Sequence, residues 1–173
     1  MTERKVRGDV LKGYIKYIKK TWGQAGVDSY ETKAGILLDE LDDKEWYDAE
    51  FLRKLHFWMA DKGKKYVSLS SSYCVQNLGL LSYIVKFMNI KTLLKKVPKS
   101  YNDGFSYGTL SIDIQEKRAM ARFKDVIIDK YTCDAWKGAL EGALLATNTK
   151  GTVTFTNEEG MGDKDCFFLM EWD

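Results

Sequence analysis

The segment from Tyr131 to the C-terminus constrains the fold more than any other part of the chain. It opens with a helical stretch in which Gly138 and Gly142 lie one turn apart on the same face. A glycine inside a helix costs about 1 kcal/mol relative to alanine, so this pair indicates that the helix closely approaches another element. A β-like run at Thr152–Phe155 and a terminal run at Cys166–Trp172 follow, and together they predict a hairpin.

A second hairpin is predicted just before this helix. Residues Tyr107–Ile114 alternate between polar and apolar side chains, which is typical of a half-buried antiparallel strand. Ala119–Ile127 continues as a second strand. With the helix Tyr131–Ala146 between the two hairpins, the C-terminal part has the order β-β-α-β-β.

The first half of the chain is expected to be helical. Its apolar residues recur at helical spacing, and five helices are predicted: residues 4–21, ended by Gly23 and Gly26; Ser29–Leu38; about Ala49–Lys62, for which Asp42–Asp43 and Asp48 offer caps and which Gly63 stops; a central helix Tyr73–Met88 capped by Ser70–Ser72; and Ile90–Val97, ending before Pro98. The sequence therefore predicts a single α+β domain of residues 1–173, with a helical bundle (about 4–98) followed by a four-stranded antiparallel sheet part (about 105–173).

Composition excludes several classes of protein. A hydrophobic content of 45% and a charged content of 30% exclude disordered and collagen-like chains. The net charge of +2 does not favour nucleic acid as a partner. No apolar run is long enough for a transmembrane helix, and the N-terminus lacks the apolar region of a signal peptide, so a cytoplasmic location is expected. The three cysteines are then expected to be reduced.

Motifs for catalysis are scarce. The chain has no nucleophile elbow and no glycine-rich phosphate loop, which favours a binding protein over an enzyme. His56 is the only histidine and sits among apolar residues of a predicted helix. It either ligates a haem or acts as a base, or it is a partly exposed residue without a functional role.

Two cysteines are candidates for metal binding. Cys133 falls at the start of a predicted helix, where terminal N–H groups favour a thiolate, and Cys166 begins the last strand and could face it. A structural zinc site needs four ligands, so Glu158, His56 or Cys74 would have to contribute. The alternative is that Cys133 is a small, buried, inert residue.

The C-terminal motif resembles the 4-vinyl reductase domain and its relatives in the haem-NO-binding-like group, which share their fold with subunits of the TRAPP vesicle-tethering complex. The resemblance rests on Cys133, Gly138, Gly142, Gly162 and Cys166 and covers Tyr107–Trp172. It implies that Cys133 and Cys166 belong to a metal-binding set, although Glu158 stands where many 4-vinyl reductase domains have a further cysteine.

The resemblance also bears on haem. Haem-binding relatives combine a helical histidine, here His56, with a downstream Tyr-x-Ser-x-Arg clamp for the propionates. The nearest string, Tyr66–Ser70, has serine in place of the arginine, which argues against haem.

The function predicted from the sequence is a non-enzymatic, sensor-like domain. A small apolar or aromatic ligand would lie between the central helix and the helix Cys133–Ala146. The face of the latter helix that carries the two glycines would form one wall of the site. The predicted ligand-binding residues are Tyr73, Cys74, Tyr83, Trp136, Gly138 and Gly142. In the alternative reading of the glycines, the helix packs tightly on the sheet. Two other functions stay open: an adaptor that forms a homodimer, and a metal- or haem-binding protein with zinc or haem as the cofactor.

Overall fold

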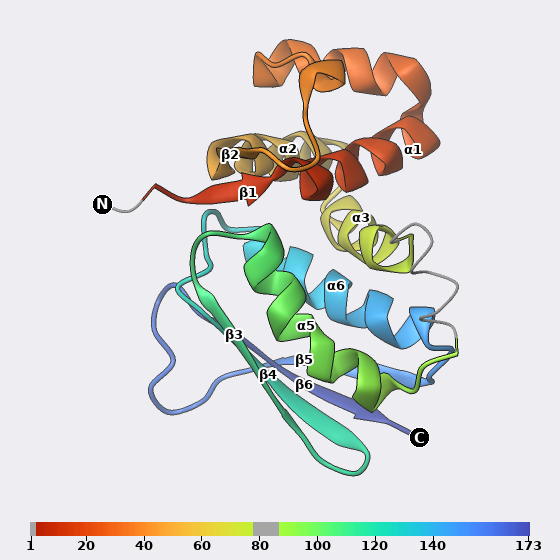
Figure 1. Ribbon diagram of the computed structural model, residues 1–173, viewed down its shortest axis with the longest axis vertical. Helices are drawn as coiled ribbons and strands as arrows, with labels where there is room; N and C mark the ends of the chain where they lie inside the picture. Colours follow the sequence, from red (N-terminus) through yellow and green to blue (C-terminus); the bar gives the residue numbers. More distant parts are fainter. Residues whose placement is uncertain (1–2, 78–86) are drawn as a thin grey trace.

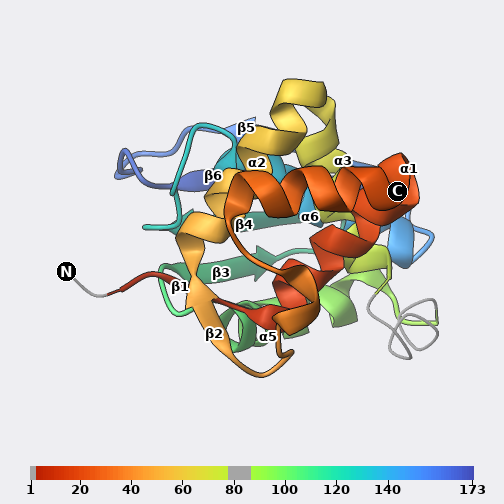
Figure 2. The same ribbon diagram turned by 90° about the horizontal axis from the view of Figure 1, so that it is seen from above.

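The computed structural model describes residues 3–77 and 87–173 (Figures 1 and 2). A helical half comes first and a sheet half second, and the elements follow one another as β1 (Lys5–Arg7), α1 (Gly8–Ala34), the 3-10 helix η1 (Leu38–Glu40), β2 (Trp46–Asp48), α2 (Ala49–Lys62), α3 (Lys65–Gln76), α5 (Ile90–Gly104), β3 (Thr109–Ile114), β4 (Arg118–Lys124), α6 (Thr132–Ala146), β5 (Gly151–Thr156) and β6 (Cys166–Trp172). The predicted α+β class and the β-β-α-β-β order of the C-terminal half are confirmed.

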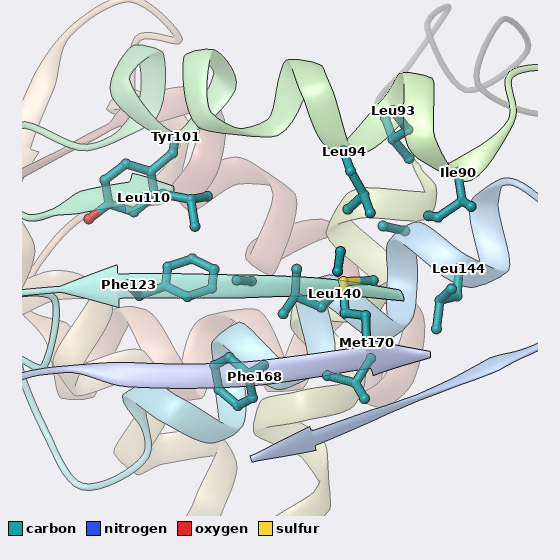
Figure 3. Close-up of a cluster of buried hydrophobic side chains, with 14 of the residues drawn as sticks. Ile90, Leu93, Leu94, Tyr101, Leu110, Phe123, Leu140, Leu144, Phe168 and Met170 are labelled. Atoms are coloured by element: carbon teal, nitrogen blue, oxygen red, sulfur yellow. The ribbon is translucent and has the colours of Figure 1, made fainter. Parts of the chain in front are cut away.

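The sheet half is a four-stranded antiparallel sheet in the order β3-β4-β6-β5, with α5 and α6 lying over one face (Figure 1). Leu110 pairs with Phe123, and Ala121 pairs with Phe168, so these side chains share the helix-facing side. Figure 3 shows Leu94 and Tyr101 of α5 pointing onto that side. All of these residues are buried, and they form the core of the sheet half.

The helical half has its own apolar core, built mainly from α1, α2 and α3. Helix α1 bends sharply at Gly23, whose backbone is non-helical (φ 69°, ψ −166°). Beyond the bend the helix turns back over its first part (Figure 1), and the hydroxyl of Tyr30 donates to the carbonyl of Phe51 in α2 (2.8 Å). The sequence correctly marks Gly23 as the end of a helical segment.

Strand β1 connects the two halves. It pairs with β2 in the helical half, while Val6 also forms a bridge with Phe105 after α5. Arg4, just before the strand, donates from Nη1 to the carbonyl of Ile127 (2.8 Å). The start of the chain is therefore held by residues of the sheet half as well as by β2.

Replacing Gly23 by alanine is expected to lower the free energy of unfolding by about 1–3 kcal/mol, because its backbone conformation is accessible almost only to glycine. An added Cβ would meet no atom within 4 Å, so the effect would come from the backbone and not from a clash. Urea unfolding followed by circular dichroism measures it. Gly26→Ala in the same helix is less informative, because its Cβ would press on Trp22. A Gly23→Ala protein as stable as the wild type would contradict the expectation.

Several predicted boundaries are wrong. The helix predicted at Ser29–Leu38 is the second part of α1 and ends at Ala34. Tertiary packing explains three others. Residues 5–7 form a strand instead of the start of a helix, because they pair with β2. Ser70–Ser72 lie buried inside α3, so they do not cap a helix that begins at Tyr73; α3 ends at Gln76, and most of the rest of the predicted helix Tyr73–Met88 lies outside the described residues. Helix α5 continues through Pro98 to Gly104, because Leu94 and Tyr101 bury one face of the helix on both sides of the proline.

The helix predicted at Ala49–Lys62 is confirmed at both ends. Asp48 accepts a hydrogen bond from the backbone N–H of Glu50, and Gly63 follows the last turn. Within residues 3–77 and 87–173, no helix combines the length and apolar character that a membrane crossing requires.

Candidate functional site

The paired glycines of α6 lie against α3. A Cβ at Gly138 would coincide with the backbone carbonyl of Ser68, and a Cβ at Gly142 would lie 2.7 Å from the carbonyl oxygen of Ser72. The close approach indicated by the glycine spacing is present, but the partner of the glycine face is a helix and not the sheet. At these two glycines, the backbone of α3 lies where a ligand on the glycine face would lie. Most of the predicted central helix Tyr73–Met88 falls outside the described residues.

The predicted ligand-binding residues are distributed over two cores. Tyr73 packs on Tyr17 in the helical half (5.5 Å between ring centroids). Trp136 stacks on Phe123 in the sheet half (4.7 Å). Tyr83 lies outside the described residues.

Cys74 faces the first part of α1. Its sulfur would lie 3.1 Å from a Cβ at Gly13. The residue keeps some exposed surface, but burial raises the pKa of its thiol to about 12. At neutral pH this thiol is therefore protonated and poorly reactive.

His56 of α2 is buried between the two halves of the molecule. Its Nδ1 lies 3.1 Å from Oδ2 of Asp129, in the linker between β4 and α6, and both side chains are 2% exposed. The other carboxylate oxygen, Oδ1, accepts from the backbone N–H of Tyr131 (2.7 Å) and from the hydroxyl of Thr132 (3.3 Å). Nδ1 of the ring therefore faces the carboxylate, and Nε2 is the ring nitrogen that this contact does not use.

The second ring nitrogen of His56, Nε2, has no hydrogen-bond partner in the described part of the chain. Among the described residues, His56 Nε2 and Trp136 Nε1 are the buried side-chain nitrogens without a hydrogen bond. The ring of Tyr14 stands edge-on to the His56 ring (6.1 Å between centroids), and its hydroxyl is hydrogen-bonded to Ser71 of α3 (2.9 Å). Burial raises the pKa of Tyr14 far above its usual value, so this phenol stays neutral.

A narrow apolar crevice lies in the helical half. Its walls come from both parts of α1, from the segment around η1 and from α2, and the lining residues are Leu11, Ile15, Tyr30, Ile36, Leu38, Leu41, Phe51 and Leu55. At no point is the space between these side chains wide enough for a water molecule. The two parts of α1 that wall the crevice are joined at Gly23.

Haem, the cofactor implied by the resemblance, does not fit the described residues. His56 offers a free, well-oriented nitrogen of the kind that ligates metals. However, the space beside α6 is filled by α3, and the apolar crevice is far narrower than ligand pockets of roughly 300–1,000 Å³. No haem chemistry is therefore assigned to His56.

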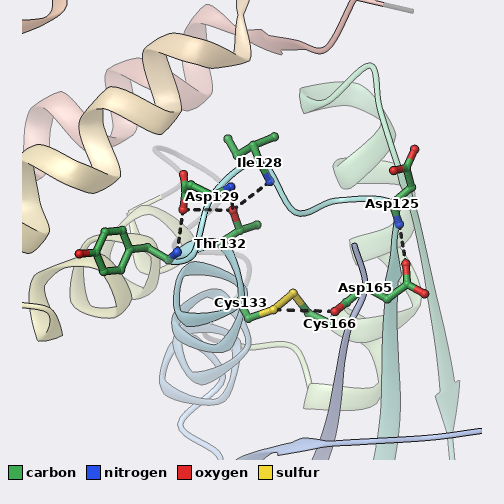
Figure 4. The surroundings of a disulfide bond; sticks show 8 residues. Asp125, Ile128, Asp129, Thr132, Cys133, Asp165 and Cys166 are labelled. Atoms are coloured by element: carbon green, nitrogen blue, oxygen red, sulfur yellow. Dashed lines mark hydrogen bonds between the residues drawn. A yellow bond between two sulfur atoms is a disulfide. The ribbon is translucent and has the colours of Figure 1, made fainter. Parts of the chain in front are cut away.

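Cys133 and Cys166 form a disulfide across 33 residues of sequence, with their Cα atoms 5.6 Å apart (Figure 4). The expected proximity of the two sulfurs is present, but the expectation that these cysteines are reduced is wrong. Glu158 forms a two-bond ion pair with Arg122 (2.7 and 3.1 Å).

Within the described part of the chain, no group of three or more histidine, cysteine, aspartate or glutamate side chains is placed to hold a metal ion. The predicted set of Cys133, Glu158 and Cys166 is therefore not assembled in this structure.

The sequence analysis did not identify Asp129. Its local signal is an aspartate three residues before the start of α6, a position typical of a turn that leads into a helix. That signal predicts the bond to Tyr131 but not the contact with His56, which is 73 residues away in sequence. The crevice carries no sequence signal, because its residues look like any other apolar core positions.

Comparisons with known proteins point to one fold. The sequence matches no family model and no curated protein. Among solved structures, the chain is similar to a Cs H-NOX mutant with 4-cyano-L-phenylalanine at site 5 (14% identity, 96% of each chain covered, TM-score 0.76). It is also similar to an oxygen-binding H-NOX domain related to soluble guanylate cyclases, in its oxygen complex (13% identity, 96% of this chain and 95% of that chain, TM-score 0.75).

A third similar structure is a point mutant of the H-NOX domain from T. tengcongensis (13% identity, 96% of this chain and 97% of that chain, TM-score 0.75). Each likeness spans almost the whole of both chains at very low sequence identity, so it concerns the fold alone. The chain has the haem-NO-binding-like fold.

Proposed function

We propose that this chain is a non-enzymatic, sensor-like domain that takes up a small apolar ligand in the crevice of its helical half. The observation that carries the proposal is the apolar crevice, which is walled by both parts of α1 on either side of the bend at Gly23. The likeness to H-NOX domains, one of them described as oxygen-binding, supports a sensing role.

The crevice is closed in this structure, which limits the size of the ligand and requires a movement of its walls before a ligand can enter. Since no part of it admits a water molecule, a ligand enters only when the two parts of α1 move apart. The walls are leucine, isoleucine and aromatic side chains, so the ligand would be an apolar molecule of a few heavy atoms. A dry apolar cavity of about 150 Å³ holds benzene or xenon, so the crevice would have to open to about that volume to bind one. Because α2 forms one wall of the crevice, ligand binding would also displace α2.

This location differs from the one predicted from the sequence. A ligand between α3 and α6 would have to displace backbone from the glycine face. A ligand in the crevice displaces side chains and turns one glycine, which costs less free energy. We therefore place the ligand among Leu11, Tyr30 and Leu55 and not over Gly138.

Benzene tests the proposal. At about ten times its dissociation constant, benzene is expected to raise the melting temperature by about 3–6 °C. Ile36→Phe, at the half-buried wall of the crevice, is expected to occupy the space that the ligand would enter and to abolish this shift. The matched control is Ile112→Phe, a half-buried position at the other core, which should keep the shift. Thermal melts followed by circular dichroism give the measurement.

Two results would contradict the proposal. One is a wild-type melting temperature that does not change up to the solubility limit of benzene. The other is an equal shift in the Ile36→Phe protein, which would place the binding elsewhere. The homodimer and the cytoplasmic location inferred from the sequence stay predictions, and light scattering on the purified chain tests the first.

A further inference from the structure

The disulfide lies at the base of the linker that carries Asp129. Cys133 is the second residue of α6 and Cys166 is the first residue of β6. The linker, residues 125–131, runs from the end of β4 to the start of α6 (Figure 4). A cross-link at this point joins the start of the helix to the sheet directly behind the linker.

The segment before Cys166 holds the first part of the linker. Asp165 accepts a hydrogen bond at Oδ1 from the backbone N–H of Asp125 (2.8 Å). The carbonyl of Lys164 accepts from the N–H groups of Val126 (2.9 Å) and Ile127 (3.1 Å). One side of the linker is thus fixed by residues next to one end of the disulfide.

The other side of the linker is fixed next to Cys133. The hydroxyl oxygen of Thr132 accepts from the backbone N–H groups of Ile128 (3.3 Å) and Asp129 (3.2 Å). Asp129 in turn reaches across to His56 in the helical half. An uninterrupted series of bonded neighbours therefore leads from the two sulfurs to the only histidine of the chain.

The two cysteines differ in exposure. Cys166 is fully buried, whereas Cys133 is partly exposed. Cys133 also lies in the first turn of a 15-residue helix, where free backbone N–H groups stabilise a thiolate. An external thiolate would reach Cys133, and once released this residue would have a stabilised anionic form.

We propose that Cys133 and Cys166 form a reversible redox site, which controls how firmly the linker holds Asp129 against His56. The reductant is a dithiol. One of its thiolates attacks Cys133 Sγ, the electron pair of the S–S bond leaves on Cys166, and a mixed disulfide forms at Cys133. The second thiol of the reductant then displaces Cys133. The products are two cysteine thiols, which take up the two protons of the reductant, and the oxidised reductant with its own disulfide.

This site does not depend on the apolar crevice, and its test needs no ligand. The purified protein is compared in reduced and in oxidised dithiothreitol. On reduction, the backbone N–H groups of Asp125, Val126, Ile127 and Tyr131 are expected to exchange with deuterium about tenfold faster, while exchange within β4 and β6 stays the same. The protein should remain folded by circular dichroism, and reoxidation should restore the slow exchange.

The single histidine gives a second readout. The imidazole signals of His56 can be assigned without ambiguity in an NMR spectrum, and they are expected to shift on reduction. The double variant Cys133→Ala/Cys166→Ala should show the reduced pattern under both conditions. Cys74→Ala is the matched control, because Cys74 takes no part in the disulfide, and it should respond like the wild type.

Several outcomes would overturn the proposal. If air-oxidised protein contains three free thiols, the disulfide does not form. If the linker exchange and the His56 signals are the same in both conditions, the bond has no influence on the linker. If reduction unfolds the whole chain, the bond is a structural staple and not a switch.

Discussion

Replacing Gly138 by alanine is expected to lower the free energy of unfolding by about 3 kcal/mol or more, the largest effect that we predict for a single added carbon. In an open helix this substitution stabilises by about 1 kcal/mol. Here the new Cβ would meet the backbone carbonyl of Ser68, and neither helix can move without disturbing its own core. Urea unfolding followed by circular dichroism measures the difference.

Gly13→Ala is the matched control, because Gly13 also lies on a helix packed against α3. Its Cβ would meet the sulfur of Cys74 at 3.1 Å, a side-chain atom that can shift. We therefore expect a change within about 1 kcal/mol of zero for this variant. A Gly138→Ala protein with unchanged or increased stability would show that α3 and α6 are not in backbone contact.

Replacing Asp129 by alanine is expected to destabilise the protein by about 2–5 kcal/mol, because it leaves two buried donors without an acceptor, at about 1–3 kcal/mol each. The variant would leave Nδ1 of His56 without an acceptor and would also remove the bond from the N–H of Tyr131. His56→Phe should be less harmful, since it replaces the ring by an apolar one of similar size. Chemical unfolding of both variants tests the order.

The control for this comparison is an exposed ion pair near the same helix. Asp134 lies 3.3 Å from the ammonium of Lys64, and the lysine side chain is mostly exposed. Asp134→Ala should change the stability by only about 0–1 kcal/mol. If Asp129→Ala proves no more harmful than Asp134→Ala, the buried pair does not join the two halves.

Local signals predicted those parts of the fold that depend on local physics. Helix α2 was placed at both ends because Asp48 caps it and Gly63 stops it within a few residues. The strand alternation around Leu110 predicted a face that is in fact buried. Pro98 predicts the end of a helix, but α5 continues past it because Leu94 and Tyr101 of the same helix are buried in the core.

The candidate sites depend on partners that lie far apart in sequence. The spacing of Gly138 and Gly142 indicated that something comes close but could not identify Ser68 and Ser72 as the neighbours. The contact of His56 with Asp129 joins two segments with no shared pattern. The resemblance to known families placed Cys133 and Cys166 near each other, but it implied a metal where the structure has a covalent bond.

The pairing of the first strand has a consequence for how the chain reaches its final state. Val6 forms a β-bridge with Phe105, and Arg4 donates a hydrogen bond to the carbonyl of Ile127, which is 123 residues further along the chain. During synthesis from the N-terminus, these early residues are made long before their partners. Contacts of such separation form slowly, so the seam between the halves closes late, after α1 and α2 have already packed.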